Sequence, residues 1–348
     1  MIRVLVVDDS AVLRRLITSV LAQDPAIEVV GAARDGLEAI EMVDALQPDA
    51  VTLDVEMPRL DGLGALAVIH PRHPRLPIIM FSTLTERGAA STLEALSNGA
   101  SDYVTKPSNT GSMAESMTEV REQLVPRIKA LAGARRVGAA RPVVRRQPAP
   151  RRAPCELLVV ASSTGGPDAL AQVLAALPGD LPVPVLVAQH MPPVFTTMFA
   201  ERLDRVSALS VREAVDGDLV VPGLVLVAPG DRHLRISRVA GVTRARLDDG
   251  PKENFCRPAA DPLFRSAAET FGDGVGALVL TGMGHDGLAG CREIAERQGR
   301  VLVQDEATSV VWGMPGAVAN AGLADEVVPL GEIAGRLASL VAGPLLQR

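Results

Sequence analysis

Residues 156–174, ELLVVASSTGGPDALAQVL, run from a strand-like apolar segment through a turn of small residues into a helix-like segment. A continuous apolar run is typical of a parallel strand buried on both faces, and the helix after it carries the chain back to the next strand. This alternation continues along the chain and predicts a doubly wound, mostly parallel α/β domain. The other predicted strands are 183–189, 224–229, 277–282 and 300–304; helices are predicted at 168–177, 260–270 and 287–298, and an antiparallel ribbon around 234–247.

The first part of the chain shows the same alternation in a shorter form. Up to about Val125, five strand-like runs are separated by helix-like stretches, which predicts a five-stranded, doubly wound domain of flavodoxin-like topology. The predicted strands are 2–7, 27–33, 48–54, 77–82 and 102–106, and helices are predicted at 11–23, 36–46 and 89–97. The chain is therefore expected to hold two α/β domains.

A change of composition separates the two patterns. Residues 133–154 hold seven arginines among Pro, Ala and Gly, and no acidic residue. Repeated proline and repulsion between like charges favour an extended, solvated tether, and the arginines are interpreted as a source of solubility. We predict a first domain over 1–122, a helix end and Arg/Pro-rich linker over 123–153, and a second domain over 154–346.

The composition excludes several classes of protein. The chain has 348 residues, 47% hydrophobic and 2% aromatic, which fits two cores built from aliphatic side chains. A net charge of -6, without a basic face carrying interleaved aromatics, argues against nucleic-acid binding. Cys155, Cys256 and Cys291 lack the spacing of a metal site or disulfide framework and are interpreted as core or surface thiols. No signal peptide or membrane-spanning segment is recognised, so we expect a cytoplasmic protein without direct membrane insertion.

Acidic residues follow two strands of the first predicted sheet. Asp8 and Asp9 come after the first strand and Asp54 after the third, and ligands of an open parallel sheet gather at these carboxyl ends. Three neighbouring carboxylates would repel one another unless a hard cation, Mg²⁺, shared their oxygens. Lys106 ends the fifth strand, so its ammonium would face the acids and could neutralise charge on a group transferred to an aspartate. Taken singly, each acid could also be a helix cap or a turn residue.

Four sequence blocks of this part resemble response-regulator receiver domains, namely VLVVDDS (4–10), VTLDVEMPRLDG (51–62), MFST (80–83) and GASDYVTKP (99–107). The resemblance covers about the first 120 residues. It implies that Asp54 accepts a phosphoryl group from a histidine kinase and that Lys106 contacts this group. It further implies that Mg²⁺ is held by Asp8, Asp9, Asp54 and the carbonyl of Glu56. The implied switch residues are Tyr103 and Ser82, with Thr83 as the adjacent alternative to Ser82. Tyr103 could instead simply fill a gap at the sheet edge.

A hydrolytic site is expected in the second domain. The serines of residues 161–166 stand where a strand turns into a helix, whose unpaired N–H groups and dipole can stabilise an oxyanion. His190 and Asp286 also follow strands, so a base and its orienting acid could meet a serine at one sheet edge. His285 is the rival base. These residues could equally be turn and cap residues, and GMGHDG (282–287) has the spacing of a dinucleotide fingerprint but no convincing acid downstream.

Five blocks of this part resemble the chemotaxis protein-glutamate methylesterase family, namely SSTGG (162–166), VAQHMPP (187–193), LVAPGDRHL (226–234), TGMGHDG (281–287) and VWGMPGAV (311–318). The resemblance covers about residues 155–345. It implies that Ser163 is the nucleophile, rather than Ser162, with His190 as general base and Asp286 as its orienting acid. It also implies that Thr164 and the backbone of Met283 border the oxyanion site. The chain departs from the family's pattern at Ala161 and Ser162, where glycine and alanine are frequent, and at His285, where asparagine is common.

The two resemblances together imply a phosphorylation-activated hydrolase. It would remove methyl esters from glutamates of methyl-accepting chemotaxis receptors and deamidate selected receptor glutamines, with no cofactor for the ester reaction. The phosphodonor would be the chemotaxis histidine kinase, and the unphosphorylated first domain is expected to inhibit the second. A phosphorylation-controlled binding module with a decayed hydrolase site is the competing hypothesis. A DNA-binding output would require a basic recognition helix, which the second domain lacks.

Overall fold

The computed structural model describes residues 1–107, 112–134 and 154–342. The chain divides into two compact units, Met1–Ala139 and Ala140–Arg348. Residues 135–153, which hold most of the predicted linker, lie outside the described residues. The domain boundaries at 122, 153 and 346 therefore stay predictions.

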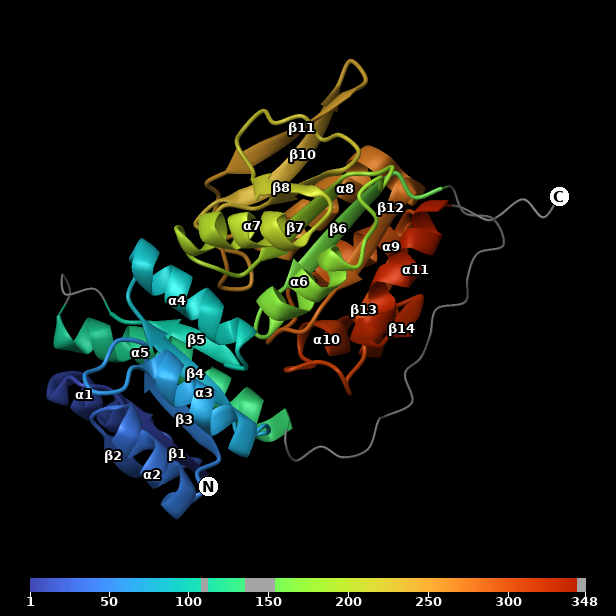
Figure 1. Ribbon diagram of the computed structural model, residues 1–348. Helices are drawn as coiled ribbons and strands as arrows, with labels where there is room; N and C mark the ends of the chain where they lie inside the picture. The colour runs from blue at the N-terminus through green and yellow to red at the C-terminus, as the bar shows by residue number, and fades with distance from the viewer. Residues whose placement is uncertain (108–111, 135–153, 343–348) are drawn as a thin grey trace. The chain divides into compact units, whose positions relative to one another are not determined.

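The first unit is a five-stranded parallel sheet in the order β2-β1-β3-β4-β5, with helices on both faces (Figure 1). α1 and α5 pack together on one face, and α2, α3 and α4 follow one another on the other. The strand order reverses between β1 and β3, which makes their carboxyl ends the switch point where a ligand is expected. The elements are β1 (Ile2–Val7), α1 (Ala11–Leu21), β2 (Ile27–Ala33), α2 (Gly36–Leu46), β3 (Ala50–Asp54), α3 (Gly62–Arg72), β4 (Ile78–Ser82), α4 (Glu86–Ser97), β5 (Asp102–Thr105) and α5 (Met113–Ala134).

The second unit is a seven-stranded parallel sheet in the order β14-β13-β12-β6-β7-β9-β8, with a separate antiparallel ribbon, β10-β11. From β6 the chain builds the sheet in one direction, then returns to β12 and builds it in the other. The switch point therefore lies between β6 and β12. The elements are β6 (Leu157–Ser162), α6 (Gly166–Ala175), β7 (Val185–Gln189), α7 (Phe195–Val206), β8 (Ser210–Glu213), β9 (Leu224–Val227), β10 (His233–Val239), β11 (Val242–Asp248), α8 (Ala260–Phe271), η1 (Gly272–Gly274), β12 (Val275–Val279), α9 (Leu288–Glu296), β13 (Arg300–Gln304), α10 (Met314–Asn320), β14 (Glu326–Val328) and α11 (Leu330–Ala342).

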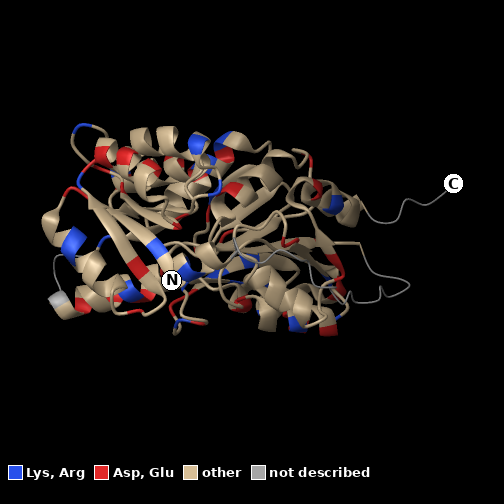
Figure 2. Cartoon of the chain, turned by 90° about the horizontal axis from the view of Figure 1, so that it is seen from below, with Lys and Arg blue, Asp and Glu red and all other residues tan. Residues whose placement is uncertain are grey.

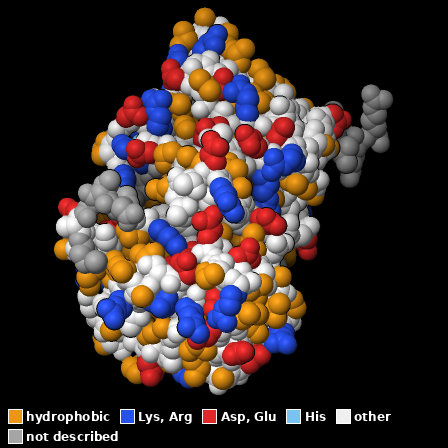
Figure 3. Space-filling view, turned by 60° about the vertical axis from the view of Figure 1, so that its left-hand side comes forward, with side chains coloured by type: hydrophobic (Ala, Val, Ile, Leu, Met, Phe, Trp, Pro, Cys, Tyr) orange, Lys and Arg blue, Asp and Glu red, His pale blue; other side chains and the backbone are white. Residues whose placement is uncertain are grey.

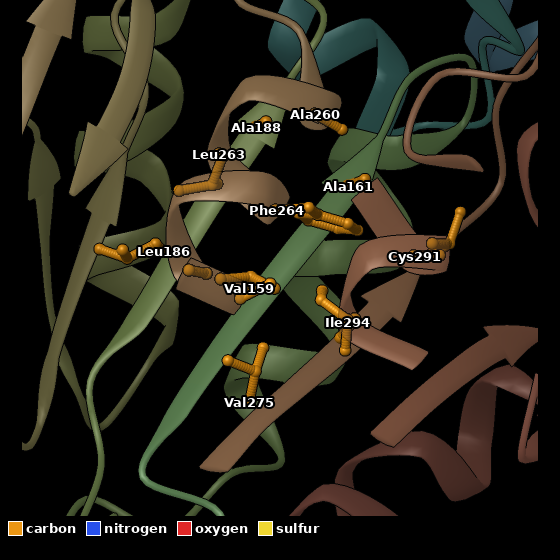
Figure 4. Packing of buried hydrophobic residues seen from close by; sticks show 14 of the residues in the cluster. Val159, Ala161, Leu186, Ala188, Ala260, Leu263, Phe264, Val275, Cys291 and Ile294 are labelled. Carbon is orange, nitrogen blue, oxygen red and sulfur yellow. The ribbon is translucent and has the colours of Figure 1, made fainter. Parts of the chain in front are cut away.

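The core between this sheet and its helices fixes the position of α8. Phe264 of α8 is fully buried in one core cluster with Val159 and Ala161 of β6 and Ile294 of α9 (Figure 4). Burying such a side chain contributes about 2–3 kcal/mol. Gly290 lets the two helices approach, because a Cβ there would lie 2.3 Å from the Cβ of Phe264. We expect Gly290→Ala to push α8 away and with it the N–H groups at its start.

Charged residues of both signs are interspersed over the chain (Figure 2). Several form exposed ion pairs, such as Arg72 with Asp44 and Arg232 with Asp249, which contribute little to stability. Among the described residues, no helix is both long and apolar enough to cross a membrane.

The predicted parallel α/β class and the antiparallel ribbon are confirmed, and every strand and helix predicted from the sequence is present within a few residues of its predicted ends. The pattern missed the short strands β8 and β14, which complete the two edges of the second sheet. Edge strands are half exposed, so their sequences lack the continuous apolar run on which the prediction depends.

Candidate functional site

Three adjacent strands deliver the candidate catalytic residues to one sheet edge. Ser163 follows β6, His190 follows β7, and Asp286 lies in the loop after β12. β6 pairs with both neighbouring strands in parallel register, so their carboxyl ends coincide. The backbone N–H of His190 donates to the carbonyl of Ser162 at 3.1 Å, which places the histidine beside the serine turn.

The two serines of the turn have different environments. Ser162 is fully buried, and its hydroxyl donates to Oε1 of Gln189 at 2.6 Å. Ser163 is half-buried, its N–H donates to the carbonyl of Thr281 at 3.1 Å, and its carbonyl accepts from Nε2 of Gln189 at 3.1 Å. No hydrogen bond from Ser163 Oγ is found among the described residues. The backbone of Ser163 is thus fixed while its hydroxyl stays available, which favours Ser163 over Ser162 as nucleophile.

Close packing also shapes the space around Ser163. A Cβ on Gly282 would lie 2.9 Å from the Cβ of Ser163 and 2.4 Å from the sulfur of Met314. The carbonyl of Gly282 accepts from the N–H of Met314 at 2.8 Å, which holds the loop after β12 against the start of α10. Only glycine fits between the serine and this loop.

The Asp286 carboxylate is held by several donors. It accepts from Nε2 of His190 at 2.7 Å, from Nδ2 of Asn254 at 2.8 Å, and from the N–H groups of Ala260 and Asp261 in the first turn of α8 at 2.6 and 3.2 Å. Burial favours the neutral acid, but the bonds and charge of His190 and the other donors outweigh it and lower the pKa of Asp286 to about 2. Asp286 is therefore ionised at neutral pH, and it can orient His190 and stabilise the protonated form of that ring.

Both ring nitrogens of His190 have partners. Nε2 faces the Asp286 carboxylate, and Nδ1 lies 3.4 Å from the sulfur of Cys256. Because ionised Asp286 can only accept, Nε2 carries the hydrogen in the neutral ring and Nδ1 is the basic atom. Burial opposes protonation, but the Cys256 sulfur and the Asp286 carboxylate outweigh it and raise the pKa of His190 to about 10.

The other histidines of this unit have different roles. The His285 side chain is exposed, and among the described residues no hydrogen bond to its ring is found, although it precedes Asp286. His233 is buried and structural: its Nε2 bonds the carbonyl of Pro251 at 3.0 Å and its Nδ1 accepts from the N–H of Ala259 at 3.2 Å. Only His190 therefore joins the buried carboxylate as a candidate base.

The two residues predicted to border the oxyanion come from two loops, the serine turn and the loop after β12. Thr164 is buried, and its carbonyl accepts from Oγ1 of Thr281 at 2.9 Å. Met283 is half-buried in the loop after β12. α6 begins at Gly166, whose N–H donates to the carbonyl of Ser163 at 2.8 Å, so the positive end of the helix dipole lies just after Ser163. This environment suits a developing oxyanion.

The first unit brings its three acids together. One oxygen each of Asp8, Asp9 and Asp54 lie within 4.8 Å of one another. Oδ2 of Asp8 and Oδ2 of Asp54 are buried without a hydrogen-bond partner in the described structure, although Lys106 Nζ lies 3.3 and 2.7 Å from them. Such a cluster of carboxylate oxygens, two of them buried, fits the all-oxygen coordination that Mg²⁺ requires. Burial and the charge of Asp8 raise the pKa of Asp54 to about 6.

The predicted switch residues follow β4 and lie on β5. Ser82 is buried and donates to the carbonyl of Gly88 at 3.0 Å, and the hydroxyl of Thr83 lies 3.1 Å from that of Thr85. Tyr103 is buried, and burial raises the pKa of its hydroxyl. The backbone N–H of Glu56 donates to Asp54 at 3.3 Å, so this peptide borders the acids.

Sequence reasoning missed two residues that contact the His190–Asp286 pair. Cys256 was expected to be an ordinary core or surface thiol, and Asn254 was not considered. Asn254 donates to both Asp286 and Asp261, at 2.8 and 2.9 Å. Both residues lie in a loop whose path depends on the rest of the fold. The only local signal is that residues 254–256 lie three residues before the predicted helix at 260–270.

The chain matches two protein-family models in the order expected. Residues 4–118 match the response regulator receiver domain, and residues 158–337 match CheB methylesterase. Two full-length relatives are each named protein-glutamate methylesterase/protein-glutamine glutaminase. One, from Nocardioides sp., is 54% identical and covers 95% of this chain and 93% of its own, and one from Pyrococcus horikoshii is 45% identical and covers 95% and 91%.

A solved structure is similar to the second unit. The crystal structure of the Thermotoga maritima CheB methylesterase catalytic domain has a TM-score of 0.53 and 43% identity, and covers 54% of this chain and 100% of that one. The sheet edge that carries Ser163, His190 and Asp286 thus lies in the region that matches CheB methylesterase, and the acidic pocket lies in the region that matches the receiver domain. This chain belongs to the CheB methylesterase family and carries a response regulator receiver domain before its methylesterase domain.

Proposed function

We propose that the chain hydrolyses γ-glutamyl methyl esters of chemotaxis receptors, and deamidates receptor glutamines, under the control of phosphorylation at Asp54. The observation that carries the proposal is the buried pair of His190 and ionised Asp286 beside a serine whose hydroxyl is available. Membership of the family supports the substrate class, since the relatives are named for both reactions.

The proposed reaction starts at Ser163. Its Oγ attacks the ester carbonyl while its proton passes to Nδ1 of His190, the basic ring atom. Oγ must first take the place of the Cys256 thiol at Nδ1, and bonds of this kind often form only with substrate present. The imidazolium is stabilised by Asp286, and it then protonates the methoxide oxygen as the C–O bond breaks, so methanol departs and the acyl-enzyme remains.

The acyl-enzyme is resolved by water. His190 removes a proton from the water, the new hydroxide attacks the acyl carbonyl, and Ser163 leaves with that proton. The product is a free glutamate carboxylate. Thr164 and the backbone of Met283 are proposed to border the oxyanion, beside the N-terminus of α6. A glutamine substrate would release ammonia by the same steps.

In the receiver unit, Asp54 is the proposed phosphoryl acceptor, and a histidine kinase is the proposed phosphodonor. Asp8, Asp9, Asp54 and the carbonyl of Glu56 would hold Mg²⁺, which supplies charge neutralisation for the transfer. Lys106 would contact the phosphoryl group, with Ser82 or Thr83 and Tyr103 responding to it. The ion pair between Lys106 and Asp54 at 2.7 Å supports this assignment.

The experiment measures methanol release from methylated receptor membranes with and without a small phosphodonor. We expect release by the wild type to rise with the phosphodonor, and release by Asp54→Asn to stay at the unstimulated level. A chain truncated to begin near Arg152 should be active without the phosphodonor. If a folded, phosphorylated wild type releases no methanol and no serine-directed probe labels it, the binding-module hypothesis replaces this one.

A further inference from the structure

A tight turn over Glu253–Cys256 presents one side chain to solvent beside the catalytic pair. Glu253 and Cys256 exchange both backbone hydrogen bonds, at 3.1 and 2.8 Å. Asn254 and Phe255 between them have φ of 51° and 65°, the left-handed values of a two-residue type I′ turn. Glycine usually occupies the second of these positions. A phenylalanine there costs about 1–2 kcal/mol, so other contacts must hold the turn.

Three of the four side chains in the turn are anchored. Asn254 and Cys256 contact the catalytic pair as described above, and both carboxylate oxygens of Glu253 accept from Nη2 of Arg265, at 2.6 and 2.7 Å. Phe255 is the exception, with 95% of the residue exposed. Its neighbours on both sides are fixed, so the backbone that carries the ring is held at this place.

This exposure is unusual in the molecule. Hydrophobic side chains on the face in Figure 3 are scattered among charged ones, and no other large hydrophobic residue in the described part of the chain is as exposed as Phe255; Val239, at the tip of the β10-β11 ribbon, reaches 67%. Burying a phenylalanine contributes about 2–3 kcal/mol, which this ring does not supply to the fold. An exposed aromatic ring on an anchored stretch of backbone is typical of a residue that contacts a partner.

The reaction itself brings a partner to this place. When an ester carbonyl of a protein glutamate reaches Ser163, the substrate's backbone lies within one glutamyl side chain of the catalytic residues. Phe255 is joined directly to Asn254, which bonds Asp286, and to Cys256, which touches His190. The neighbours of the modified glutamate must therefore pass close to the ring.

We propose that Phe255 is a substrate-docking residue that packs against an apolar side chain flanking the modified glutamate of the protein substrate. The inference rests on the proposed function, because only a protein substrate brings such a neighbour. Phe255 contributes to binding and takes no part in proton transfer, so its loss should raise KM for the protein and leave the chemistry at Ser163 intact.

The test compares three variants of the full chain under phosphorylating conditions. Phe255→Ala removes the ring and keeps the left-handed strain, Phe255→Gly removes both, and Phe255→Leu keeps an apolar side chain. Methanol release from receptor membranes is compared with labelling of Ser163 by a small serine-directed probe. For the Ala and Gly variants we expect kcat/KM on the receptor to fall about tenfold through KM, with probe labelling unchanged and with Phe255→Leu restoring most of the loss.

Val239→Ala is the matched control, an exposed apolar residue at the far end of the β10-β11 ribbon, and it should behave as the wild type. Equal kcat/KM in the wild type and Phe255→Ala would overturn the proposal, as would a parallel loss of probe labelling, which would mean that the ring supports the site's structure. Higher activity of the unphosphorylated variant with unchanged KM would assign the ring to the receiver instead. Failure of the proposed function looks different, since the wild type would then release no methanol.

Discussion

Asp286 and Asp54 are both buried aspartates at the carboxyl edge of a parallel sheet, yet their surroundings act in opposite directions. Asp286 meets two side-chain donors and the start of a helix, and its pKa is lowered to about 2. Asp54 is buried beside Asp8, and burial and the charge of Asp8 raise its pKa to about 6 despite the ion pair with Lys106. Protein donors balance the charge of Asp286, whereas the acidic cluster of Asp8, Asp9 and Asp54 is consistent with a Mg²⁺ site.

The largest expected effect is a loss of ester hydrolysis that leaves phosphorylation of the receiver unchanged. Ser163→Ala should lower ester hydrolysis about a millionfold, because it removes the nucleophile from a preorganised site. Ser162→Ala should cost only a few-fold, since that hydroxyl bonds Gln189. Methanol release measures the first effect, and phosphorylation of Asp54 should be unchanged in both variants. A large loss from Ser162→Ala alone would reassign the nucleophile.

The next effect tests whether the charge of Asp286 matters as much as its position. Asp286→Asn keeps the shape but places an amide where the N–H groups of Ala260 and Asp261 donate, and it no longer fixes the tautomer of His190. We expect kcat to fall about 10,000-fold. Asp305→Asn is the control, because Asp305 follows the neighbouring strand β13 and its carboxylate, within the described structure, accepts from Thr308 of its own turn alone. Near-normal activity of Asp286→Asn would show that a neutral partner suffices.

In the receiver pocket, a substitution that removes the charge of Asp54 should increase the stability of the fold. The folded-state pKa of Asp54 lies above its usual 3.8, so the folded protein binds this proton more tightly than the unfolded chain. Stability therefore falls as pH rises from about 4 to 6, and above pH 6 Asp54→Asn should stabilise the metal-free receiver by on the order of 2 kcal/mol.

Calorimetry with and without Mg²⁺ measures this difference. Mg²⁺ should raise the melting temperature of the wild type and leave Asp54→Asn nearly unchanged. Asp44→Asn removes an exposed acid of the same unit and should respond to Mg²⁺ as the wild type does. A metal-free Asp54→Asn that melts below the wild type at pH 7.5 would contradict the comparison.

The smallest effect concerns the pH dependence of the hydrolase. The raised pKa of His190, about 10, keeps the ring protonated in neutral solution, and a protonated ring cannot accept the proton of Ser163. Activity should therefore increase with pH through the neutral and alkaline range. Cys256→Ala removes one of the groups that favour protonation, so its profile should shift toward lower pH, with activity several-fold above the wild type at pH 7. An unshifted profile would show that the thiol does not influence the histidine.

Local pattern was sufficient to predict most of the sheet and the residues that end its strands. Ser163, His190 and Asp286 each follow a continuous apolar run, and the parallel arrangement then requires their proximity. Local pattern did not separate Ser162 from Ser163, which the family resemblance did; the structure adds that Ser162 ends β6 and bonds Gln189. Asn254 and Cys256 could not be predicted either. Their turn depends on left-handed backbone and on contacts with residues distant in the sequence.

The strand order of the second unit has a consequence for how the protein becomes active. Strands β6, β7, β8 and β9 come from residues 157–227, whereas β12, β13 and β14 come from residues 275–328, and the two groups join only where β6 pairs with β12. Ser163 and His190 belong to the first group and Asp286 to the second. Contacts between such distant segments form slowly, so we expect activity to return late in refolding, after most secondary structure. A newly synthesised chain would likewise stay without hydrolase activity until about its last fifth, which holds β12, β13 and β14, has joined the sheet.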